Sequence, residues 1–175
     1  MIKSHPIVVS ITLISLIWIT YFISLFTPID NYGLIPWTYQ GLIGIVSMPF
    51  LHVNFIHLLG NTISLSTLLI IAIIFHNQKV VYVVPMIIIL GGTILWFVGR
   101  EANHIGASAL IYGLALFLIF EGFLNKKPIE ILASLIVIFF FGSSLAFGIL
   151  PSHVVSWEGH LSGAVAGFFA ALIKD

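Results

Sequence analysis

The chain has no cysteine and few charged residues: Asp, Glu, Lys and Arg together make up 7% of its 175 residues. The missing cysteine excludes disulfide bonds, thiolate metal sites and a cysteine nucleophile. A soluble globule is also excluded, because 60% of the residues are hydrophobic and the mean hydropathy is +1.20. The net charge is zero, so no basic excess indicates a nucleic-acid partner. We therefore expect an integral membrane protein in a lipid bilayer.

Six apolar runs have lengths suited to crossing a membrane, since a span needs about 20 residues to cross roughly 30 Å of hydrocarbon. The runs cover residues 7–26, 54–75, 80–98, 106–124, 129–148 and 159–173, of which the last is short. The first run is followed by no signal-peptide cleavage site, so we expect it to be retained. No repeat or second domain is visible. We expect one all-α domain over residues 1–175, a compact bundle of six transmembrane helices.

The basic residues indicate the orientation, because cytoplasmic segments retain Lys and Arg. With a cytoplasmic N-terminus, Arg100 is the only basic residue on the outer side of the membrane. The other five lie on the cytoplasmic side, namely Lys3, Lys79, Lys126, Lys127 and Lys174. We therefore expect both termini on the cytoplasmic side. The predicted helices over 54–75, 106–124 and 159–173 then all begin at the outer face. The apolar connection over 27–53, which contains several Pro and Gly residues, is expected to lie in the membrane interface.

The few polar residues of the predicted helices gather in the first turns of those three. His57 and Asn61 are four residues apart, so their side chains share one helix face. Ser108 and Tyr112 have the same spacing on the fourth helix, and His160 opens the sixth. At 1.5 Å per residue, each lies within about two turns of the outer boundary. A shared site at this depth is therefore possible.

Each of these residues also has an ordinary structural interpretation. A serine in a membrane helix is more often a packing residue than a nucleophile, and His57 with Asn61 fits an interhelical hydrogen bond. His160 alone fits a proton relay or a metal ligand equally well. Small residues at four-residue spacing let helices pack closely; they are Ala109 and Gly113 on the fourth helix and Gly159, Gly163 and Gly167 on the sixth. Such packing would bring Ser108 within reach of His160.

Three stretches, in this order, resemble the rhomboid intramembrane serine proteases: MPFLHVNFIHLLGN, GASALIYG and GHLSGAVAG. The six-span core with cytoplasmic termini resembles the minimal bacterial form of that family, and the resemblance covers essentially the whole chain. It implies a multi-pass protein of a prokaryotic cell membrane. It also implies a serine endopeptidase that needs no cofactor and cleaves transmembrane segments of membrane proteins near the outer face.

The resemblance also implies a role for individual residues. Ser108 would be the nucleophile and His160 its general base. His57, Asn61 and the Ser108 backbone N–H would form the oxyanion hole. The implied supporting residues are Tyr112, which would pack against the His160 ring, the auxiliary His52, and Gly106. The helix over 129–148 would be a lateral gate for substrates, and the loop over 149–158 would cap the site.

Elementary chemistry supports these roles. Cleavage of a peptide by serine needs a base for the hydroxyl proton and donors for the oxyanion. The N-terminus of the helix over 106–124 favours negative charge. Glu158 is two residues from His160, so on a helix it points to a different side, and the other acidic residues are distant. A Ser-His dyad without an aspartate is what remains.

Two positions depart from the pattern of the family. Ala109 stands where a glycine usually follows the nucleophile, and its methyl group is expected to affect a crowded helix contact and the rate. The connection over 27–53 contains Trp37 but no arginine, so the Trp-Arg pair common in the family is missing. We expect that difference to affect the stability or lipid anchoring of this loop. Neither departure removes a catalytic group.

Two other functions stay open. A catalytically silent relative that binds transmembrane helices would have the same fold, but it predicts missing catalytic residues, and none is missing. A metal-dependent hydrolase or transporter is suggested by histidines on the outer side, namely His52, His57, His104, His153 and His160. Neither an HExxH motif nor an intramembrane carboxylate accompanies them, so we expect no metal there. The sequence indicates no oligomeric state.

Overall fold

A computed structural model describes residues 5–173 of the chain. Six long helices form the bundle: α1 (Pro6–Ser24), α3 (Phe55–His76), α4 (Val80–Val98), α5 (Ser108–Asn125), α6 (Pro128–Gly148) and α7 (Trp157–Ala171). The short α2 (Gly44–Ser47) lies in the connection between α1 and α3. Over the described residues there is no strand, only an isolated bridge between Leu34 and His104. The predicted six-helix bundle is confirmed, with helix ends shifted by a few residues.

The helices have the length and composition of membrane spans. α1, the α3–α4 pair, α5 and α6 are apolar and long enough to cross a bilayer. α7 has 15 residues and is shorter, as the run over 159–173 predicts. Large apolar side chains on α6 face outward, with Phe139 81% and Phe140 70% exposed. An all-helical chain with an apolar exterior is an integral membrane protein.

Local signals fix the helix ends near the candidate site. The Asn54 side chain caps α3 by accepting a hydrogen bond of 2.9 Å from the His57 backbone N–H. Ser156 caps α7 in the same way, accepting from the Gly159 N–H at 3.2 Å. These caps set the helical positions of His57 and His160, which follow within the first turn of each helix.

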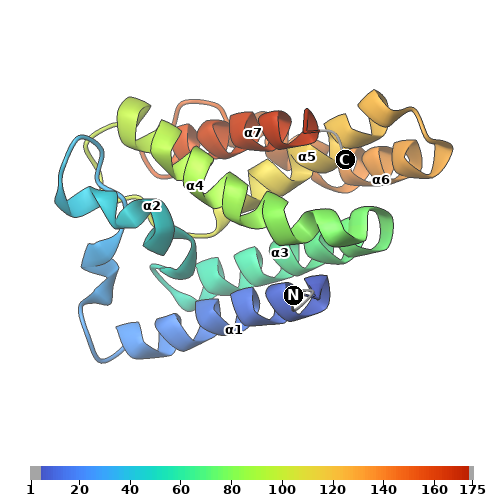
Figure 1. The fold of residues 1–175 in the computed structure, drawn as a ribbon. Helices are drawn as coiled ribbons and strands as arrows, with labels where there is room; N and C mark the ends of the chain where they lie inside the picture. The colour runs from blue at the N-terminus through green and yellow to red at the C-terminus, as the bar shows by residue number, and fades with distance from the viewer. Residues whose placement is uncertain (1–4, 174–175) are drawn as a thin grey trace.

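The direction of the helices agrees with the alternation expected from the sequence. α1 begins, and α7 ends, on the side of the bundle where the α3–α4 and α5–α6 connections lie (Figure 1). The first turns of α3, α5 and α7 lie together on the opposite side. Placing the former side in the cytoplasm stays a prediction. Two of the basic residues on which this prediction rests, Lys3 and Lys174, lie outside the described residues.

α5 is the central helix of the bundle. Its side chains are buried along most of its length, with Leu110, Leu114 and Leu118 at most 1% exposed. It packs most extensively against α7 and also contacts α6, α4 and α3. Since α5 begins at Ser108, that serine lies at one end of the central helix.

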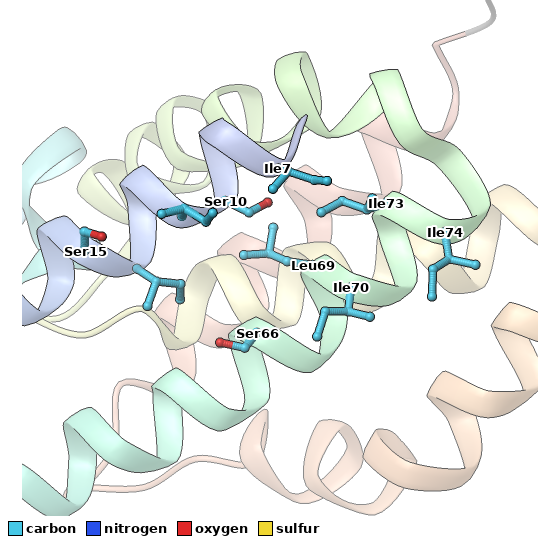
Figure 2. A pocket seen from close by; sticks show the side chains of 10 residues that line it. Ile7, Ser10, Ser15, Ser66, Leu69, Ile70, Ile73 and Ile74 are labelled. Carbon is cyan, nitrogen blue, oxygen red and sulfur yellow. The ribbon is translucent and has the colours of Figure 1, made fainter. Parts of the chain in front are cut away.

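An apolar groove of 470 Å³ lies at the periphery, between α1 and α3. Figure 2 shows Ile7 and Ser10 of α1 opposite Leu69 and Ile73 of α3. Because these residues come from the start of α1 and the end of α3, the groove lies toward the α3–α4 connection. It contains none of the predicted catalytic side chains.

Candidate active site

His52, His57 and Asn61 form a hydrogen-bonded group at the start of α3. The Asn61 side-chain amide donates from Nδ2 to His52 Nε2 at 3.0 Å and to His57 Nε2 at 3.1 Å. The two imidazole rings meet edge to face, with centroids 5.1 Å apart. Asn61 and His52 are buried, and His57 is half-buried. The two side chains that the sequence predicts for an oxyanion hole, those of His57 and Asn61, are thus adjacent, and His52 lies beside them.

His52 precedes α3 and is 1% exposed. Burial, reinforced by the neighbouring His57, lowers the pKa of His52 to about 4. The ring is therefore neutral at physiological pH, which suits its acceptance of a hydrogen bond from the Asn61 amide. His52 thereby helps to fix the Asn61 side chain.

Gly106 brings the start of α5 against this group. Its φ of +119° lies in a region that L side chains rarely adopt. A Cβ at this position would stand 2.7 Å from His57 Cε1 and 3.4 Å from Asn61 Nδ2. The Gly106 N–H also donates to the Met48 carbonyl at 2.9 Å. The backbone that leads into Ser108 therefore lies directly beside His57 and Asn61, and only glycine allows this approach.

His160 is held between α5 and α6. Its ring is stacked on that of Tyr112, with centroids 4.2 Å apart and planes at 6°. His160 Nδ1–H donates to the Gly148 carbonyl at 2.7 Å, and the Tyr112 hydroxyl donates to the Ser144 carbonyl at 2.6 Å. With Nδ1 carrying the proton, Nε2 is the nitrogen left to accept one.

The partner of His160 Nδ1 is a backbone carbonyl, whereas a Ser-His-Asp triad has a carboxylate in that place. Glu158 is buried and lies two residues before His160 in the sequence. Its Oε1, however, lies 3.5 Å from Arg100 Nη1. The expectation from the sequence that Glu158 points to a different side agrees with this contact.

Glycines on α7 bring it close to α5. A Cβ on Gly163 would lie 1.9 Å from the Ala109 carbonyl oxygen, and a Cβ on Gly167 would lie 1.9 Å from that of Gly113. Gly159 differs, since its nearest neighbours are the side chains of Ser156 and Leu95. Of the three predicted packing glycines on α7, two therefore pack against α5, and the third lies against the helix cap and α4.

Ser108 is half-buried at the first position of α5, one turn before Tyr112. Within residues 5–173 no hydrogen bond joins its Oγ to His160. Catalytic hydrogen bonds are often long or absent in a free enzyme and tighten when substrate binds. The Tyr112–His160 stack and the contact of Gly163 with Ala109 nevertheless bring the start of α5 against the start of α7.

The Ala109 methyl does not enter this contact. The side chain of Ala109 is 6% exposed and belongs to a small apolar cluster with Leu34, Met48 and Leu95. The backbone of Ala109, with its carbonyl oxygen nearest, faces Gly163. The methyl that the sequence places beside the nucleophile thus packs against the first connection and α4.

Three residues hold the loop before α7 in a role that the sequence analysis does not predict for them: Arg100, His104 and Ser156. The Arg100 guanidinium donates to the carbonyls of Ser152 and Val155, which hold the loop before α7. Ser156 donates its hydroxyl to His104 Nδ1 at 2.6 Å, while His104 Nε2–H donates to the Arg100 carbonyl at 3.1 Å. Burial lowers the pKa of His104 and favours this neutral form. The network fixes the start of α7, and its sequence signals are the isolated Arg100 and the nearby His104 on the predicted outer side.

The first connection is fastened without the family's Trp-Arg pair. The Trp37 ring packs against Trp96 and Phe97 of α4, with centroids 5.4 and 5.5 Å away. The Trp96 indole N–H donates to the Thr38 carbonyl at 3.1 Å. Three residues before Trp37, the backbones of Leu34 and His104 exchange hydrogen bonds of 2.8 and 2.9 Å. Aromatic packing and backbone pairing therefore hold this loop against α4 and the segment before α5.

Comparisons with known proteins find one family model and several proteins whose sequences are similar to this chain. The sequence model of the rhomboid domain matches residues 39–174. Uncharacterized proteins of Mycobacterium tuberculosis and Mycobacterium bovis are each 38% identical over 155 residues, which is 83% of this chain and 64% of each relative. An uncharacterized protein of Mycobacterium leprae is 32% identical over 175 residues, 93% of this chain and 69% of that protein. The chain thus spans less than two thirds of the first two relatives.

Proposed function

Because the chain belongs to the rhomboid family, we propose that it is an intramembrane serine endopeptidase with Ser108 as nucleophile and His160 as general base. The observation that carries the proposal is the fixed orientation of His160. Its ring is stacked on Tyr112, and its Nδ1–H is bound to the Gly148 carbonyl. An imidazole held in one tautomer at the start of α7, beside the start of α5, suits proton transfer with Ser108.

In the proposed reaction, His160 Nε2 takes the Ser108 Oγ proton as the oxygen attacks the carbonyl carbon of the substrate. Collapse of the tetrahedral intermediate breaks the C–N bond, and His160 gives its proton to the leaving amine. Water then attacks the acyl-enzyme, again with His160 as the base. The bond between the acyl carbon and Ser108 Oγ breaks, the new carboxyl end of the substrate leaves, and His160 returns a proton to Oγ. The Gly148 carbonyl supports the imidazolium formed in each half-reaction by accepting its Nδ1–H.

The developing oxyanion would be bound by the Ser108 backbone N–H, Asn61 Nδ2 and His57. The backbone N–H lies at the first position of α5, where the helix dipole favours negative charge. Asn61 Nδ2 now donates to two histidines, so it would redirect one N–H toward the substrate. Gly106 supports this arrangement because its lack of a side chain lets the α5 backbone approach His57.

The proposed substrates are transmembrane helices of other membrane proteins, in a prokaryotic cell membrane. A substrate helix would enter past α6, whose exposed Phe139, Phe140 and Phe147 face the surroundings of the bundle. Near the outer face its backbone must unwind to expose a peptide bond, and unpaired backbone groups are costly in lipid. Segments with small or helix-breaking residues are therefore the favoured substrates.

A fluorophosphonate probe tests the proposal on the full chain purified in detergent. We expect wild-type protein and Ser66→Ala to be labelled, because Ser66 lies in the peripheral groove between α1 and α3. Ser108→Ala should lose labelling entirely, and His160→Ala should lose most of it. Labelling that persists in Ser108→Ala would contradict the assignment. A folded wild type that is never labelled and cleaves no transmembrane peptide would favour the silent helix-binding relative.

A further inference from the structure

A second polar cluster lies at the end of the bundle opposite His57 and Ser108. His76 is the last residue of α3, Glu121 lies four residues before the end of α5, and Glu130 lies in the first turn of α6. Their exposed fractions are 7%, 2% and 6%. Each offers one ligand atom, and these atoms lie within 4.8 Å of one another. Three helix ends therefore bring an imidazole and two carboxylates to one buried point.

Two atoms of this cluster lack partners. His76 Nε2 and Glu121 Oε2 are buried, and neither makes a hydrogen bond within the described residues. Buried polar atoms in folded proteins almost always have a partner, so an unpaired nitrogen and an unpaired carboxylate oxygen within one buried cluster indicate a missing ligand. His76 is itself held in place by edge-to-face packing on Phe117, with centroids 5.5 Å apart.

The remaining carboxylate oxygens are fixed by donors. Asn125 Nδ2 donates to Glu121 Oε1 at 2.7 Å and to Glu130 Oε2 at 2.8 Å, so it joins the two carboxylates. Lys79 Nζ lies 2.6 Å from Glu121 Oε1, and Lys127 Nζ lies 2.9 Å from Glu130 Oε1. The Lys127 side chain is 66% exposed and is free to swing away when a cation binds. A polar cavity of 290 Å³, lined in part by His76 and Glu130, adjoins the cluster.

From this arrangement we propose that His76, Glu121 and Glu130 bind a divalent transition-metal ion of the zinc class. Imidazole combined with carboxylates suits such ions, whereas magnesium and calcium prefer oxygen ligands alone. Ligand atoms on one tetrahedral zinc ion stand about 3.4 Å apart, so the cluster closes on the ion by side-chain shifts on the order of an ångström. The ion would clamp the ends of α3, α5 and α6. The site is independent of the proposed peptidase activity.

Zinc alone is the probe that tests this site, on the full chain purified in detergent and stripped with chelator. We expect wild type to take up about one zinc per chain and to melt at a higher temperature as zinc is added. His76→Gln and Glu130→Gln should each lose the bound zinc and the thermal shift. His153→Gln, which removes an exposed histidine from the loop before α7, should keep both.

Uptake of zinc by His76→Gln equal to that of wild type would overturn the proposal, as would a wild type that binds none at micromolar zinc. Circular dichroism and gel filtration check that each variant is folded. If His76→Gln fails to fold, the near-isosteric Glu130→Gln carries the test. X-ray absorption of zinc-loaded wild type gives a second readout, and a zinc environment without imidazole scattering would also overturn the site.

Discussion

At the scale of single residues, the central feature is how His160 is oriented. In a serine-protease triad a carboxylate holds the histidine tautomer and stabilises the imidazolium. Here a neutral carbonyl, that of Gly148, accepts the Nδ1–H, and the Tyr112 ring covers one face of the imidazole. Neither contact involves a charged group. The position of His160 therefore depends on close packing at the end of α6.

Gly148→Ala tests that dependence. A Cβ at Gly148 would lie 1.7 Å from the Tyr112 hydroxyl oxygen and 3.2 Å from His160 Nδ1, so Tyr112 must leave its bond to Ser144. We expect kcat/KM for a transmembrane peptide to fall on the order of 100-fold, the cost of misplacing a catalytic group by about 1 Å. Gly142→Ala is the matched control, because its Cβ would meet only Ile138 at 3.7 Å. Equal rates for both variants would refute a positioning role.

At the scale of helices, the close approach of α5 and α7 has a backbone origin. Gly163 and Gly167 each face a carbonyl of α5, and Gly91 of α4 also packs near Gly163. Backbone atoms cannot rotate out of the way as side chains do, so an added methyl must separate the helices. The distance between the first turns of α5 and α7 is therefore set by glycine.

Gly163→Ala measures this packing. Its Cβ would lie 1.9 Å from the Ala109 carbonyl oxygen, and we expect a loss of about 1–3 kcal/mol of stability or more. Fluorophosphonate labelling should fall with it, because Ser108 and His160 move apart. Gly60→Ala on α3 is the control: a Cβ there meets nothing within 4 Å, and alanine favours helix by up to about 1 kcal/mol. A melting temperature for Gly163→Ala at or above that of Gly60→Ala would contradict this account.

At the scale of the whole molecule, the alternating helices separate two polar regions. The candidate catalytic side chains lie where α3, α5 and α7 begin, and the His76 cluster lies where α3 and α5 end and α6 begins. Apolar packing of Leu65, Leu114 and Leu118 fills the bundle between them. Each polar region is thus confined to one end of the bundle.

The orientation of the chain is testable because it has no cysteine. His153→Cys and Gln78→Cys place single thiols at exposed positions, in the loop before α7 and in the α3–α4 connection. In intact cells a membrane-impermeant maleimide should label His153→Cys, and it should label Gln78→Cys only after permeabilisation, because the positive residues hold the latter connection inside. The reverse pattern would show that the N-terminus faces outward.

Much of the fold and part of the site follow from local patterns. Each of the six helices is encoded by a predominantly apolar run, and the caps Asn54 and Ser156 lie next to the helices they begin. The pairing of His57 with Asn61 follows from their four-residue spacing. The contacts that join Arg100 and His104 to the loop before α7 could not be predicted, because their partners lie 52 or more residues apart along the chain.

The sequence by itself determined a helical membrane bundle and the residue types at the starts of three helices, because apolar length and helical spacing are local properties. Only the tertiary structure decided what each polar group meets. It gave His160 a carbonyl from α6, turned the Ala109 methyl toward Leu34 and Leu95, and gathered Glu121 and Glu130 around His76. Those contacts depend on helix rotation and approach, which are fixed where glycines let backbones touch.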